Sequence, residues 1–261
     1  MKNNYEEILK QLVESDERFI VMTAENRAAI RNLPDQINKN FIDVGIAEQT
    51  IVGMAAGLAL RGRIPIVHAL ATFLTMRAFE FIRTDVGIPN LPVKLIGGVP
   101  GLLSDGNGPT HQAIEDISLM RSIPNMNIFC PADEDDLLKC IEQILKSPSP
   151  FYVRFNNSKP IFKHSENFEI GKAEIISKGN DITILTYGLL FSETIIAKSI
   201  LEKQGFSVGL INLRTLKPID ENIIISCANT SSLLVTVEDH FLTGGLFSII
   251  SELLIKNHIL I

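Results

Sequence analysis

The chain has 261 residues, of which 46% are hydrophobic and 21% charged, with a formal net charge of −6. This composition is ordinary for a globular protein of one large or two average domains, and the acidic balance argues against a nucleic-acid partner. No apolar run reaches the ~18 residues of a membrane span, no secretory signal is visible, and the three cysteines lack metal or redox spacing, so we expect a cytoplasmic protein with no membrane contact.

Helix and strand patterns alternate along the chain, as they do in α/β proteins. In the first part we expect helices over 5–14, 46–60, 73–83, 114–121 and 133–146, and strands over 19–23, 64–70, 93–97, 127–130 and 151–154. A polar connector over 156–167 marks the expected domain boundary. Beyond it we expect strands over 182–188, 207–213 and 233–238, and helices over 192–204 and 247–254. The prediction is two consecutive α/β domains, residues 1–160 and 170–261, each with a mainly parallel sheet flanked by helices.

Glu48 is the single ionisable residue in the apolar stretch 46–60, where small residues recur at Gly53, Ala56 and Ala59. The pattern predicts a helix packed on most sides. Glu48 then has two interpretations. It either supports the helix N-terminus, where acidic residues are common, or it is a buried acid kept protonated near neutral pH by apolar surroundings. The helix pattern alone favours the first.

Two later segments change that balance. Phe73, Met76 and Phe79 recur at helical spacing after the strand over 64–70. Such a stripe normally belongs to a hydrophobic core. A glycine-rich polar loop, 105–112, contains His111 near its end, and a lone histidine after a loop is weak evidence of chemistry. Each segment is ambiguous when it is considered separately.

Taken in order, these segments resemble the transketolase family of thiamine diphosphate enzymes. The matching strings are Gly-Ile-x-Glu at 45–48, Thr-Phe-Leu at 72–74, Gly-Pro-Thr-His-Gln at 108–112, Pro-Ala-Asp at 131–133 and Tyr-Val-Arg-Phe at 152–155. They are similar to the family's pyrimidine-binding domain over about 19–156, and Val-Glu-Asp-His at 237–240 resembles its C-terminal domain. An ordered set of motifs is far more specific than any one of them.

The resemblance implies roles for the cofactor-facing residues. Glu48 would hydrogen-bond N1′ of the aminopyrimidine of thiamine diphosphate and favour the tautomer that removes the C2 proton. Phe73, Met76 and Phe79 would form the pyrimidine pocket, with Phe73 stacked on the ring. His111 would face the substrate hydroxyls and transfer protons, so Glu48 and His111 are the expected catalytic residues.

The resemblance also implies that Arg154 binds the phosphate of a sugar substrate, together with Asn107 and Arg27 as further substrate contacts. Two positions depart from the family pattern, because Asn107 replaces an aspartate and Val99 replaces a phosphate-binding histidine. We therefore expect a modified or deoxygenated sugar. Arg27 or Arg83 could replace the missing phosphate ligand, although each also fits a solvated surface arginine.

A partner chain is implied by what the sequence lacks. It contains no Gly-Asp-Gly motif of the kind that binds the diphosphate with Mg²⁺ in this family. The chain thus resembles the C-terminal subunit of a split transketolase that transfers a two-carbon ketol unit. The N-terminal subunit would hold Mg²⁺ or Ca²⁺, in an α2β2 heterotetramer with interfacial sites. No metal ligand is expected in this chain, and its second domain looks short at its end.

Two alternatives stay open. The chain could serve another thiamine diphosphate enzyme, similar to deoxyxylulose-phosphate synthase or to a 2-oxoacid dehydrogenase β subunit. It could also be a catalytically silent scaffold subunit, although the presence of Glu48, Phe73, His111 and Arg154 together argues against that.

Overall fold

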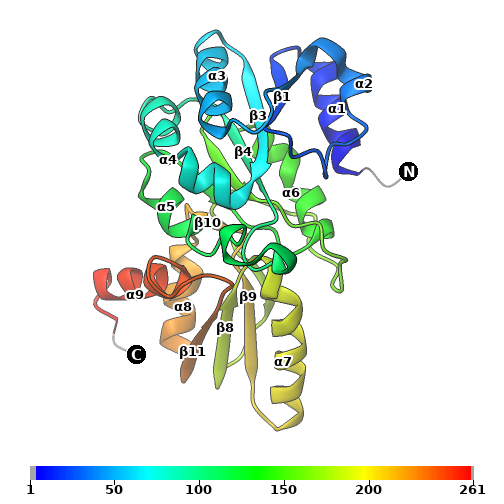
Figure 1. The fold of residues 1–261 in the computed structure, drawn as a ribbon. Helices are drawn as coiled ribbons and strands as arrows, with labels where there is room; N and C mark the ends of the chain where they lie inside the picture. Colours follow the sequence, from blue (N-terminus) through cyan, green and yellow to red (C-terminus); the bar gives the residue numbers. More distant parts are fainter. Residues whose placement is uncertain (1–3, 260–261) are drawn as a thin grey trace.

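The computed structural model describes residues 4–259, which form two sheets in succession (Figure 1). The larger sheet has the strand order β10-β5-β6-β4-β3-β1-β2, and the smaller has the order β11-β8-β9-β7. All neighbouring strands are parallel except β10 against β5 and β7 against β9. The predicted α/β class, with mainly parallel sheets flanked by helices, is confirmed. The last residues of the second domain, 260–261, where the sequence looks short, lie outside the described residues.

The elements have the following bounds. The larger sheet contains β1 (Phe19–Thr23), β2 (Phe41–Asp43), β3 (Ile64–Leu70), β4 (Lys94–Gly98), β5 (Asn127–Phe129), β6 (Phe151–Arg154) and β10 (Thr215–Lys217); the smaller contains β7 (Glu174–Ser177), β8 (Ile182–Thr186), β9 (Val208–Asn212) and β11 (Leu233–Val237). The α-helices are α1 (Tyr5–Ser15), α2 (Pro34–Ile37), α3 (Glu48–Leu60), α4 (Phe79–Phe81), α5 (Asp116–Ser122), α6 (Glu134–Lys146), α7 (Phe191–Lys203), α8 (Glu221–Thr230) and α9 (Leu246–Lys256), and η2 (Phe73–Arg77) and η3 (Ile82–Gly87) are π-helical turns. No helix in residues 4–259 has both the length and the apolar character that a bilayer span requires.

The central strands of the larger sheet, β1, β3, β4 and β6, are buried on both faces, which explains their largely apolar sequences. Side chains of β1 alternate, so that Phe19 and Val21 join one core cluster while Ile20 and Met22 join the other. Helices α1 and α6 cover the first of these faces, and α3 and α4 cover the opposite one (Figure 1). The edge where these parallel strands end is therefore held between two helical layers.

One face of α3 differs from the prediction of a helix packed on most sides. Ile51, Val52 and Ala55 are fully buried, but Met54 is 40% exposed and Leu60 72% exposed. These apolar side chains face solvent in the single chain. The sequence shows that the helix is apolar all round, but it does not show which chain covers the second face.

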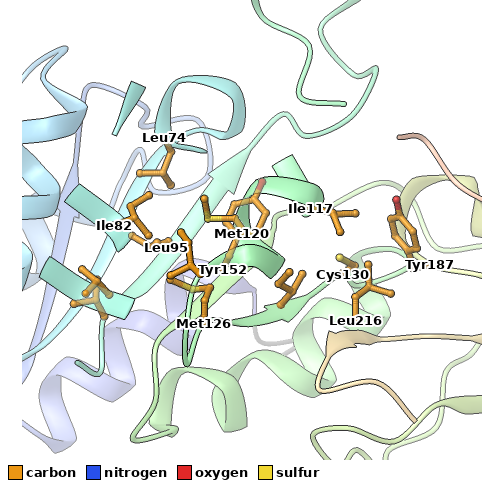
Figure 2. Close-up of a cluster of buried hydrophobic side chains, with 14 of the residues drawn as sticks. Leu74, Ile82, Leu95, Ile117, Met120, Met126, Cys130, Tyr152, Tyr187 and Leu216 are labelled. Atoms are coloured by element: carbon orange, nitrogen blue, oxygen red, sulfur yellow. The ribbon is translucent and has the colours of Figure 1, made fainter. Parts of the chain in front are cut away.

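The two sheets share a continuous hydrophobic core. Figure 2 shows this cluster extending from Leu74 and Ile82 beside the larger sheet to Tyr187 and Leu216. Leu216 belongs to β10, which comes from the second part of the chain yet pairs with β5 of the first sheet. The sequence placed this segment in the second domain, because a local pattern does not reveal pairing with a strand that lies far earlier in the chain.

The cysteines belong to the interior. Cys130, Cys140 and Cys227 are all buried free thiols, in agreement with their lack of metal or redox spacing in the sequence. Burial raises the pKa of each thiol, which keeps it protonated at neutral pH. They therefore pack as small apolar side chains.

A buried charge cluster joins the connector to both sheets. Arg214 forms ion pairs with Asp136 (Nε–Oδ1, 2.7 Å) and Glu174 (Nη2–Oε1, 2.9 Å). His164, in the connector, bonds Glu174 through Nδ1 at 2.6 Å and Asp133 through Nε2 at 3.2 Å. Asp136, His164 and Glu174 lie close enough to hold a metal ion, but Arg214 already forms ion pairs with Asp136 and Glu174. We interpret the cluster as a structural network of ion pairs that holds the connector against the two sheets.

We expect His164 to make stability fall above neutral pH. Burial alone would lower the pKa of His164, but the bonds to Asp133 and Glu174 outweigh it and raise the pKa from 6.5 to about 9. Folding thus favours the protonated ring, so this stabilisation is complete below about pH 6.5 and is lost as the pH rises through about 9. Calorimetry should show a falling Tm over that window in the wild type and a shallower fall in His164→Gln. Equal slopes in the two proteins would contradict the assignment.

Candidate active site

A tight turn after β2 brings Glu48 to the edge of the larger sheet. Gly45 has a φ of 69°, which favours glycine, and its N–H donates to Asp43 Oδ1 at 2.9 Å. The chain then enters α3 at Glu48, whose carboxylate is 2% exposed. Glu48 is therefore both a first-turn acid, stabilised by the helix dipole, and a buried acid. The structure thus shows the first-turn position of the one interpretation and the burial of the other, and the protonation of Glu48 stays a prediction.

Glu48 lines a pocket of about 400 Å³ at the carboxyl ends of β1 and β3. The lining residues are Ala24, Glu25, Asn26, Ile46, Glu48, Leu70, Phe73 and His111. β1 and β3 are parallel neighbours, and the chain leaves β1 towards β2 on one side and β3 towards β4 on the other. This is the topological switch point at which open α/β sheets bind ligands. The structure thus brings together Glu48, Phe73 and His111, as predicted from the motifs.

His111 lies edge-on against Phe73. Their ring centroids are 5.0 Å apart with an interplanar angle of 70°. The Nδ1 atom of His111 lies 2.9 Å from the Thr110 hydroxyl, and the ring is half-buried. Contacts on two sides orient this imidazole beside the pocket, which suits a group that exchanges protons with a bound molecule.

Arg77 is the main contact of Glu48 that sequence reasoning did not assign. Its Nη1 donates to Glu48 Oε2 at 2.7 Å, and its guanidinium carbon lies 4.4 Å from the centroid of the Phe73 ring. The sequence spacing indicates this contact, because Arg77 follows Phe73 by four residues and can lie on the same side of a helix. The ion pair gives this buried carboxylate an oppositely charged partner.

Met76 and Phe79 do not line the pocket. Met76 is 42% exposed, and its sulfur accepts a hydrogen bond from the Thr72 hydroxyl. Phe79 packs partly buried against the core. The resemblance implied a pocket role for both residues, and the sequence pattern predicted a regular helix over 73–83. In the structure Phe73–Arg77 is a π-helical turn, and Ala78 departs from helical dihedrals (φ −100°, ψ 13°).

The other expected substrate contacts also lie outside the pocket lining. Asn107 is exposed and donates to Ser104 Oγ at 3.1 Å. Arg27 is exposed and bonds Asp43 through Nε at 2.8 Å, and Arg83 is exposed on η3. None of these three side chains is brought to Glu48 in the described residues.

The position of Arg154 in the structure does not fit its predicted role as a phosphate ligand. It is 2% exposed, donating from Nε to Asp116 Oδ2 at 2.8 Å and from Nη1 to Asp239 Oδ1 at 2.7 Å. Its Nη2 also donates to the carbonyl of Ala113 at 3.1 Å. A guanidinium enclosed by two buried carboxylates is not open to a substrate phosphate. The sequence did not reveal this, because Asp239 comes from the second part of the chain.

The loop after β1 supplies pocket residues that the sequence did not single out. Glu25 lines the pocket with a φ of 63°, an uncommon conformation for a residue other than glycine. Asn26 lies against Gly98, where an added Cβ would stand 2.4 Å from Asn26 Nδ2. Val99, which stands where the family pattern has a phosphate-binding histidine, also has a positive φ of 53°. Backbone strain of this kind tends to gather at functional sites.

The pocket residues fit a flat heterocycle. Ala24, Ile46, Leu70 and Phe73 supply apolar surface, and Glu48 supplies one buried carboxylate that can bond a polar ring edge. Among the residues that the structure describes, the lining includes no lysine or arginine that could hold a diphosphate. The chain therefore has residues suited to one half of a cofactor such as thiamine diphosphate.

Comparison with known proteins identifies the family. Residues 1–160 match the pyrimidine binding domain of transketolase, and residues 171–260 match the transketolase C-terminal domain. The chain belongs to the transketolase family. Members of this family depend on thiamine diphosphate, and this chain is a transketolase-type subunit that contains the pyrimidine-binding and C-terminal domains.

Individual relatives agree with this assignment. A 6-deoxy-6-sulfo-D-fructose transketolase subunit from Clostridium sp. is 34% identical over 98% of this chain and 81% of its own length. A 1-deoxy-D-xylulose-5-phosphate synthase from Dictyoglomus thermophilum is 38% identical over 94% of this chain, but only 41% of its own length. A solved split-gene transketolase, described as an inactive β4 tetramer, superposes with a TM-score of 0.88 at 31% identity, covering 97% of this chain and 84% of its own.

Proposed function

We propose that this transketolase chain is the C-terminal subunit of a two-chain enzyme that moves a two-carbon ketol unit from a ketose to an aldose. The observation that carries the proposal is the buried carboxylate of Glu48 beside Phe73, in a pocket at the switch point of the sheet. Thiamine diphosphate, when bound, supplies the nucleophilic carbon and the electron sink for such chemistry.

The chain's own residues would bind the pyrimidine half and control protons. Glu48 would hold and exchange a proton at N1′ of the pyrimidine, and Phe73 would contact the face of the ring. His111, fixed by Thr110 and Phe73, would exchange protons with substrate hydroxyls at the open side of the pocket. Apolar neighbours such as Ile46 and Leu70 would exclude water from the reacting groups.

An N-terminal subunit would complete the site. Among the described residues, the pocket lining includes no lysine or arginine that could hold the diphosphate. Ile46 in the lining (71% exposed) and Leu60 at the far end of α3 (72% exposed) present apolar surface to solvent. We propose that the partner binds this surface and holds Mg²⁺ with the diphosphate, in an α2β2 assembly. The solved relative composed of β chains alone, described as inactive, supports the need for a second kind of chain. The unpaired thiols favour a cytoplasmic location.

The substrate is proposed to be a modified sugar. Arg154 is neutralised by Asp116 and Asp239, and Asn107 and Val99 replace the acidic and basic groups of ordinary transketolases. The name of the Clostridium relative specifies a sulfonated deoxy sugar. A sugar with an unusual group at its distal end fits a site that lacks the usual phosphate contacts.

A donor panel tests this function. The complex is purified through a tag on this chain, supplied with thiamine diphosphate and Mg²⁺, and given phosphorylated, sulfonated and neutral ketoses with aldose acceptors. Products that gain two carbons, measured by mass, are expected, with the modified donors preferred. A parallel reaction replaces the ketoses with pyruvate, and release of CO₂ from it would favour the synthase activity suggested by the 38% identical relative. No reaction with any donor would favour a silent subunit.

A further inference from the structure

Arg77 makes both of the contacts expected of the cofactor's ring. Its guanidinium donates to Glu48 Oε2 at 2.7 Å and lies 4.4 Å from the centroid of Phe73. Glu48 and Phe73 are the two residues to which the proposed function gives the polar edge and the flat face of the pyrimidine. One arginine side chain therefore meets the same carboxylate and the same aromatic ring.

The chemistry of the two groups is alike. A guanidinium is planar and cationic, with N–H donors in its plane, and it stacks on aromatic rings. An aminopyrimidine that bonds a carboxylate is also planar, with its nitrogen edge directed to the acid. The guanidinium thus contacts the Glu48 oxygen and the face of Phe73. These are the same two contacts that an aminopyrimidine ring would make.

We infer that Arg77 is an internal substitute for the aminopyrimidine. Thiamine diphosphate must displace the Arg77 guanidinium in order to bind, and this requirement lowers the affinity of the chain for the cofactor. This inference rests on the proposed function of Glu48. The Arg77 side chain is 41% exposed, whereas that of Glu48 is 3% exposed, so Arg77 is the partner able to move out into solvent. Its departure leaves Glu48 Oε2, which the guanidinium otherwise occupies, free to bond the ring of the cofactor.

The same contact has a use before the cofactor is present. A carboxylate as buried as Glu48 is costly to leave without a partner. Arg77 supplies that partner in the free chain. Arg77 is therefore a positioning residue that stabilises the empty pocket and is exchanged for the cofactor.

Cofactor binding to the complex tests the inference. Isothermal titration with thiamine diphosphate and Mg²⁺ should show Arg77→Gln binding about tenfold more tightly than the wild type, a difference of about 1.4 kcal/mol. The isolated Arg77→Gln chain should have a lower Tm, because Glu48 loses its partner. Arg31→Gln is the control, since Arg31 is an exposed arginine in the turn before α2, and it should change neither quantity.

The outcomes separate this inference from the function on which it rests. If the wild-type complex binds the cofactor and Arg77→Gln binds it equally or more weakly, Arg77 is not a substitute and the inference is overturned. If the wild-type complex binds no thiamine diphosphate, the proposed function itself fails. Arg77→Lys, which keeps the charge but loses the planar fork, gives a second measurement if Arg77→Gln folds poorly; its affinity should lie between those of the wild type and Arg77→Gln.

Discussion

Glu48→Gln should reduce ketol transfer by about 10²–10⁴-fold while leaving the complex assembled. Glutamine has nearly the same shape, and its side-chain oxygen can still accept the hydrogen bond from Arg77. The amide neither takes nor releases a proton at neutral pH, so the exchange proposed at the pyrimidine is lost. The measurement is kcat of the purified complex, followed by product mass.

Glu80→Gln is the matched control for that change. Glu80 is an exposed acid on α4, only a few residues beyond Arg77, and its replacement should leave kcat within about twofold of the wild type. Transfer by Glu48→Gln within about tenfold of the wild type would remove the acid–base role from Glu48, even though the chain would remain a transketolase-family subunit.

Arg154→Met should destabilise the isolated chain by about 3–5 kcal/mol. Asp116 and Asp239 are both buried, and removal of the guanidinium leaves two carboxylates close together without a cation. The effect should appear in urea unfolding as a lower midpoint with an unchanged slope. Asp239 comes from the second part of the chain, so this loss should also loosen the contact between the two sheets.

Arg121→Met provides the comparison at the surface of the same interface. Arg121 pairs with Glu252 of α9, but the Glu252 side chain is 62% exposed. Exposed pairs contribute about 0–1 kcal/mol, so Arg121→Met should be nearly neutral. If the two arginine variants lost equal stability, the burial argument for Arg154 would be wrong.

Much of the fold could be predicted because its strands are buried on both faces. Continuous apolar runs gave the strands Phe19–Thr23, Ile64–Leu70 and Phe151–Arg154 with the bounds that the structure has. β10 was not predicted, because three residues that pair with β5 have no local pattern of their own. The π-helical turn at Phe73–Arg77 lies within a helical pattern of apolar residues, so the sequence predicts an ordinary helix there.

The motif residues meet in the pocket where a single segment of the chain carries each side chain to the edge of the larger sheet. Glu48, Phe73 and His111 each follow a strand or turn of the larger sheet, and they meet in one pocket. Arg154 also lies at a strand end, but its partner Asp239 is 85 residues away and takes up the guanidinium. The pairing of Arg77 with Glu48 likewise depends on packing between two elements.

The most direct measurement is ketol transfer as a function of the ratio of this chain to its copurified N-terminal partner, with thiamine diphosphate and Mg²⁺ in excess. The account predicts no transfer by either chain alone and a rise that saturates at one partner for each copy of this chain. Transfer by this chain alone, or a saturated complex that binds the cofactor yet transfers no two-carbon unit, would contradict it.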